Sequence, residues 1–76
     1  MHIKIKTLPG GLYHFCVDKT DPVKSLKDKI CYRFGIIQEQ QRLIFNGNLI
    51  DDKKTFSEYS MYNNSEIMLI LDLIKH

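Results

Sequence analysis

The feature that most constrains this fold is one helix-forming pattern in a chain whose other apolar segments alternate with polar residues. Asp21 can cap a helix and Pro22 suits the first helical position. Gly35 is a natural stop, because the residue after a helix often needs a left-handed conformation. Between them, apolar residues recur at three- and four-residue spacing: Val23, Leu26, Ile30 and Phe34. The sequence therefore predicts one amphipathic helix over 22–34, which can cover only one face of a sheet.

The segments on either side of this helix have strand patterns. Residues 1–7 and 12–17 alternate strictly and are separated by the turn signal "LPGG", so they should form a β-hairpin. After the helix come a strand at 41–45, a short extended piece near 49–50 and a last strand at about 66–72. The residues expected on the helix-covered face are Met1, Ile3, Ile5, Tyr13, Phe15, Val17, Leu43, Ile67 and Leu69. These patterns predict an α+β protein with its opposite sheet face open to solvent or to a partner.

The stretch "QRLIFNGNL" places an apolar residue on that open face. Its Asn-Gly pair is typical of a tight hairpin turn, so 41–45 should be a strand that enters this turn. Successive side chains on a strand point to opposite faces, and Ile44 therefore points outward. If the last strand pairs antiparallel with this one, Met68 and Ile70 lie within reach of Ile44.

Leu8, at the first hairpin turn, can complete this cluster, and four polar residues would surround it: Lys4, Lys6, Arg42 and Asn48. Single exposed apolar residues are common and need no explanation. Four that converge from three segments are typical of a protein–protein site, with the basic residues orienting acidic groups of the partner.

Charge and hydropathy exclude several other classes. A net charge of +2 over 76 residues is weak for a nucleic-acid-binding domain. The longest apolar run, Ile67–Leu71, is too short to cross a bilayer, and the N-terminus lacks the apolar core of a signal peptide. We therefore expect an intracellular protein of the cytoplasm, the nucleus or both, without membrane or nucleic-acid partners. In that setting Cys16 and Cys31 should be free thiols.

No catalytic motif is present, so we expect neither an enzyme nor a cofactor. One metal hypothesis arises from the hairpin. If its register pairs residue 3 with residue 15, His2 lies opposite Cys16, and with His14 these side chains could converge on zinc or copper. A further ligand is missing, and three solvated residues on a sheet face are the simpler interpretation.

The chain resembles the ubiquitin-like family over its full length, without a gap. The residues and motifs that carry the resemblance are "M-I-K-TL-G", Asp21, "KDKI" with Gly35 and Ile36, "QQRLIF-G", Asp52, Thr55, Tyr59 and Ser65. Of these, "QQRLIF-G" is the most specific. The resemblance implies a β-grasp fold, with a mixed sheet of four to five strands packed on one helix, over residues 1–76.

The resemblance also implies roles for particular residues. Leu8, Ile44, Met68 and Ile70 would form the family's hydrophobic recognition patch, and Gly47 would lie in the adjacent loop. Met68 replaces the histidine usual in ubiquitin, which makes the patch more apolar and more adaptable. Lys27 would turn toward Asp52, and Tyr59 would fix its loop through the hydroxyl group.

The end of the chain departs from ubiquitin. It reads "LDLIKH" in place of a Gly-Gly tail, and Asp72 stands where ubiquitin has an arginine read by its activating enzyme. We therefore expect a monomeric, non-conjugated interaction module, an N-terminal part of a longer shuttle or adaptor protein. It would bind proteasome receptor subunits or ubiquitin-binding helices. The alternatives are a covalent modifier truncated before a Gly-Gly terminus and a regulatory domain of a deubiquitinase or ligase.

Overall fold

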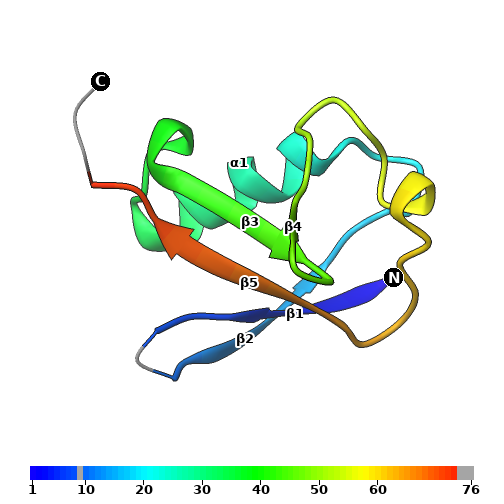
Figure 1. Ribbon diagram of the computed structural model, residues 1–76, viewed down its shortest axis with the longest axis horizontal. Coiled ribbons are helices and arrows are strands. Elements are labelled where there is room, and N and C mark those ends of the chain that lie inside the picture. Colours follow the sequence, from blue (N-terminus) through cyan, green and yellow to red (C-terminus); the bar gives the residue numbers. More distant parts are fainter. Residues whose placement is uncertain (9, 74–76) are drawn as a thin grey trace.

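The computed structural model describes residues 1–8 and 10–73, and it contains one α-helix and a five-stranded sheet (Figure 1). The strands are β1 (His2–Lys6), β2 (Leu12–Cys16), β3 (Gln41–Phe45), β4 (Asn48–Leu49) and β5 (Ser65–Leu71). The helix is α1 (Val23–Phe34), and two short 3-10 helices are η1 (Gln38–Gln40) and η2 (Ser57–Tyr59). Pro9 of the predicted turn and the predicted C-terminal positions 74–76 lie outside the described residues.

The sheet is mixed, with the strand order β2-β1-β5-β3-β4. β1 and β2 form the predicted antiparallel hairpin, in the predicted register of Ile3 with Phe15. β5 runs parallel to β1 and antiparallel to β3, so it occupies the centre of the sheet. This is the predicted β-grasp architecture, and the last strand begins and ends one residue earlier than expected.

The core lies between α1 and one face of the sheet. Every residue predicted on the covered face is buried except Met1 and Tyr13, which are partly buried and pack against the core. From the helix, Val23, Leu26 and Ile30 are fully buried. No helix in the described part of the chain is long and apolar enough to cross a membrane.

The start of α1 differs from the prediction. Pro22 is the N-cap and lies outside the helix, and no side chain caps the helix, so the prediction that Asp21 caps it was wrong. Backbone carbonyls of the loop after β4 accept the first helical amides instead. The amide of Val23 donates to Lys54 O at 2.8 Å, and that of Lys24 donates to Asp52 O at 3.0 Å. The end is as predicted, because Gly35 adopts φ 73°.

The segment between β4 and β5 contributes more to the core than its polar sequence indicates. Ile50, Phe56 and Met61 are all buried, and Phe56 has no exposed surface. Two interactions expected from the resemblance hold this segment in place. Lys27 Nζ lies 2.6 Å from Asp52 Oδ1, and the amide of Asp51 donates to the hydroxyl of Tyr59 at 2.6 Å. The segment is therefore a fixed part of the fold that borders the open face.

Candidate functional site

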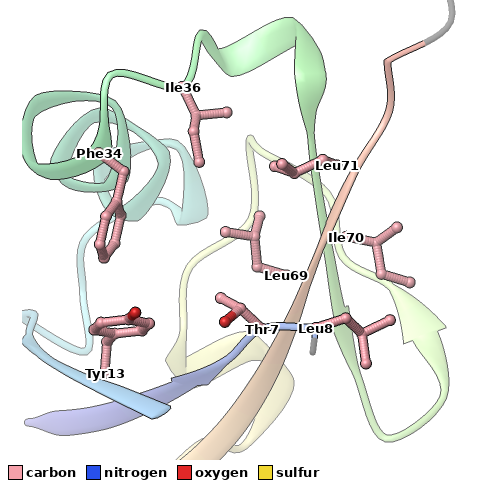
Figure 2. A pocket seen from close by; sticks show the side chains of 8 residues that line it. All are labelled: Thr7, Leu8, Tyr13, Phe34, Ile36, Leu69, Ile70 and Leu71. Atoms are coloured by element: carbon pink, nitrogen blue, oxygen red, sulfur yellow. The ribbon is translucent and has the colours of Figure 1, made fainter. Parts of the chain in front are cut away.

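The open face of the sheet brings the predicted apolar residues together. We call Leu8, Ile44, Met68 and Ile70 the apolar patch. Ile44 is the direct register partner of Met68 on β5, and Arg42 is the partner of Ile70. Leu8 and Ile70 lie close together at the end of β5 (Figure 2), and both line the same groove. The sequence prediction that these side chains converge from three segments is therefore confirmed as a matter of geometry.

The turn after β3 has the geometry that its sequence predicts. Asn46 has φ 53° and Gly47 has φ 80°, so both central residues adopt the positive φ of a type I′ turn. This turn pairs β3 with β4 and places Leu49 directly opposite Ile44, with 63% of its surface exposed. The sequence analysis did not assign Leu49 to the open face. Its neighbour Ile50 is buried in the core, so the alternation of side chains along the strand could have placed Leu49 on the opposite, open face.

The two rim lysines lie on β1, beside the apolar patch. Lys6 is exposed and is the register partner of Met68, while Lys4 is half-buried and is the partner of Glu66. Their ammonium groups can therefore meet acidic groups of a molecule that covers the patch. Asn48 lies in β4, where its side-chain amide donates to Asn46 O at 3.3 Å.

The guanidinium group of Arg42 already forms an ion pair and hydrogen bonds within the chain. Its Nη2 lies 2.7 Å from Asp72 Oδ2, and its Nη1 donates to the carbonyls of Glu39 and Gln41 at 3.0 and 3.2 Å. The amide of Asp72 also donates to Gln40 O at 2.7 Å. Asp72 therefore neutralises Arg42 and fixes the end of β5 against the start of β3, so Arg42 is a weaker attractant for acidic groups than the sequence suggested.

An apolar groove of about 400 Å³ lies beside the patch at the end of the sheet (Figure 2). Its lining comes from the first hairpin, the end of α1 and the end of β5: Thr7, Leu8, Tyr13, Phe34, Ile36, Leu69, Ile70 and Leu71. The rings of Tyr13 and Phe34 meet edge to face, with centroids 4.9 Å apart. Because Leu8 and Ile70 belong to both features, the apolar surface is continuous from the patch into the groove.

The metal hypothesis is wrong, although its premise holds. His2 does lie opposite Cys16 in the hairpin register. Across residues 1–8 and 10–73, however, no group of three or more His, Cys, Asp or Glu side chains is placed to hold a metal ion. Cys16 and Cys31 are free thiols, as expected.

The fold is the β-grasp fold of a ubiquitin-like protein. A comparison with protein families shows the same, because the ubiquitin family matches residues 3–74, and this chain belongs to that family. The ubiquitin family is a family of ubiquitin-like proteins and not of enzymes.

Individual relatives differ in how much of their own length this chain covers. It is 41% identical over 73 residues to ubiquitin-like protein NEDD8 of Dictyostelium discoideum, covering 96% of this chain and 95% of that protein. It is 36% identical to NEDD8-like protein RUB1 of Saccharomyces cerevisiae, over 96% of this chain and 95% of that protein. It is 31% identical to ubiquitin-like protein 4A of Oryctolagus cuniculus, over 93% of this chain but only 45% of that protein.

Proposed function

We propose that this ubiquitin-like protein acts by binding other proteins through the open face of its sheet. The observation that supports this most directly is the register of Ile44 with Met68, which makes one apolar surface from two strands distant in sequence. Leu8 and Ile70 extend that surface, and Gly47 lies in the turn beside it. Contiguous exposed apolar surface with a polar rim is typical of interaction sites.

The partner that fits this face is an amphipathic helix or a small helical bundle. The apolar patch would contact the apolar side of the helix, and Lys4 and Lys6 would attract acidic residues along its edge. Partners of this kind include proteasome receptor subunits and ubiquitin-binding helices, and we place the protein in the cytoplasm and nucleus, where such partners occur.

A nuclear magnetic resonance titration tests this proposal. Adding a synthetic ubiquitin-binding helical peptide to ¹⁵N-labelled protein should shift the amide signals of Ile44, Met68 and Ile70 in a saturable way. Tyr32 is a suitable internal control, because it lies on α1 with 90% of its surface exposed and should not respond. Shifts confined to α1, or none at all, would contradict the assignment of the open face.

Covalent attachment to other proteins is the second candidate function, and the comparisons support it better than the adaptor prediction. This chain matches NEDD8 and RUB1 over nearly their whole length, whereas it covers less than half of ubiquitin-like protein 4A. The identity to NEDD8 and RUB1, 41% and 36%, is also higher than the 31% identity to ubiquitin-like protein 4A, and this favours a modifier function. Asp72, paired with Arg42, is the feature that an activating enzyme would have to accommodate.

Attachment can be tested in cells that express the complete reading frame. Antibodies to this chain should reveal slower-migrating adducts on denaturing gels that survive boiling in reducing agent. Mass spectrometry of those adducts should then identify an isopeptide bond from the C-terminus of the modifier. A single band of free protein would contradict attachment and would favour the adaptor function.

A further inference from the structure

A second groove extends the open face beyond the apolar patch. It has a volume of about 730 Å³ and begins at Ile44 and Met68. The turn after β3 contributes Asn46 and Gly47. The remaining lining residues come from the end of β3, from the segment that precedes β5 and from the start of β5: Phe45, Tyr59, Ser60, Tyr62, Asn64, Ser65 and Glu66. A molecule that covers the patch can therefore reach this groove without leaving the surface.

The groove combines aromatic rings with one carboxylate. Three aromatic residues line it, namely Phe45, Tyr59 and Tyr62, and Glu66 is the only charged lining residue among those that the structure describes. Phe45 and Tyr59 pack against the core, whereas Tyr62 leaves 72% of its surface exposed. The groove therefore presents an exposed aromatic ring and a carboxylate on one surface.

A tight turn before β5 fixes the position of Tyr62 relative to Glu66. The amide of Tyr62 donates to the hydroxyl of Ser65 at 3.0 Å, and the amide of Ser65 donates back to Tyr62 O at 3.0 Å. Ser65 is buried, and Glu66 follows it on the open face. The aromatic ring and the carboxylate are therefore presented by a backbone that is already ordered.

The charge of Glu66 is available to an incoming group. Lys4 is its register partner on β1, but Lys4 does not line the groove. In the part of the chain that the structure covers, the ion pairs within 4.0 Å are Lys27–Asp52 and Arg42–Asp72, and neither involves Glu66. Since Lys4 repels a cation from the β1 side, a cation would approach Glu66 from the side of Tyr62.

We infer that this groove binds an arginine or lysine side chain of the protein partner that covers the apolar patch. The inference rests on the proposed docking function and adds the charge pattern of the partner. A guanidinium group can pair with the Glu66 carboxylate while it lies over an aromatic ring, and its aliphatic stem can contact Met68. Arginine should be preferred, because its planar group both stacks and donates several hydrogen bonds.

This site fixes the direction in which the partner lies on the face. Lys4 and Lys6 on β1 favour acidic residues, and Glu66 favours a basic residue at the groove. Arg42 adds little to this pattern, because Asp72 already neutralises it. A helix with acidic residues along one edge and a basic residue at one end would satisfy both charges in a single orientation.

The direct test compares two small probes of nearly the same shape, N-acetyl-L-arginine amide and N-acetyl-L-citrulline amide. Each is titrated into the ¹⁵N-labelled protein at low ionic strength, and the amide signals of Tyr62, Ser65 and Glu66 are followed. The arginine probe should bind about three- to fivefold more tightly than the neutral citrulline probe, which is the range expected for exposed cation–π and ion-pair contacts.

Three variants locate the effect. Glu66→Gln should narrow the difference between the two probes, because only the cation–π contact then favours arginine, and Tyr62→Ala should weaken binding of the arginine probe about threefold. Glu58→Gln is the matched control, because Glu58 is an exposed carboxylate on η2 that does not line the groove, and it should leave the affinity unchanged.

Equal affinities for the two probes would overturn the inference, as would an unchanged affinity in Glu66→Gln or the absence of saturable shifts at the groove. The same experiments test the docking proposal independently of the cation site. If the helical peptide still shifts Ile44 and Met68 while the arginine probe does not bind, the docking face stands and the cation site is wrong.

Discussion

The ion pair between Lys27 and Asp52 should respond unequally to removal of its two partners. The side chain of Lys27 is 10% exposed, whereas that of Asp52 is 42% exposed. Replacing Lys27 with methionine keeps most of the volume and leaves a carboxylate that water can reach. Replacing Asp52 with alanine leaves a buried ammonium group without its partner, and an unpaired buried charge is costly.

The magnitudes follow from this difference in exposure. Breaking a fully buried pair costs about 3–5 kcal/mol, and the exposure of Asp52 reduces that to about 1–3 kcal/mol for Asp52→Ala. For Lys27→Met we expect about 0–1 kcal/mol, since apolar replacement of a buried ion is often close to neutral. A domain of this size has a total stability of about 4–11 kcal/mol, so the difference between the variants is measurable.

Urea denaturation of the two variants measures both costs, with Lys53→Met as a control for loss of an exposed lysine. Hydrogen exchange gives a second readout. Asp52→Ala should speed exchange at Val23 and Lys24, whose amides donate to carbonyls of the same loop. The reasoning would be refuted if Lys27→Met destabilised the protein as much as Asp52→Ala or more.

Two further predictions concern the core and the loop before α1. Phe56→Ala should lower the free energy of unfolding by about 3–5 kcal/mol, because Phe56 is fully buried and its truncation leaves a cavity. Urea denaturation measures this loss, and a value below about 1 kcal/mol would contradict the place of Phe56 in the core. The amide and hydroxyl of Thr20 both donate to Asp18, and they lower the pKa of that carboxyl in the folded protein. The ionised Asp18 carboxylate should therefore stabilise the fold fully above the ordinary carboxyl pKa, and this stabilisation should be lost as the pH falls through the lower pKa of the folded protein. NMR titration of Asp18 in native and in urea-unfolded protein measures both pKa values. A native pKa that is not lowered would contradict this.

Much of the fold could be predicted because its signals are periodic. The alternation of Ile3 and Ile5 with lysines identified β1, and the Asn-Gly turn placed Ile44 on the open face before any pairing was known. The pairing of Ile44 with Met68 followed once β5 was taken as antiparallel to β3.

The features that sequence reasoning missed depend on contacts between distant segments or on irregular backbone. Phe56 lies in a non-periodic segment, so no pattern marks it as core. The cap of α1 comes from the carbonyls of Asp52 and Lys54 and not from an adjacent side chain. The pairing of Arg42 with Asp72 joins residues 30 positions apart, and only the register of β3 with β5 brings them together.

The central claim is that Ile44 serves binding and contributes little to the fold, and one comparison tests it directly. Calorimetric titration of wild type and Ile44→Ala with the helical peptide should show an affinity loss of about 1–3 kcal/mol. The free energy of unfolding of the same two proteins should differ by less than about 1 kcal/mol, since Ile44 is only partly buried. A large loss of stability with unchanged affinity would show instead that Ile44 belongs to the core and that the open face is not the docking surface.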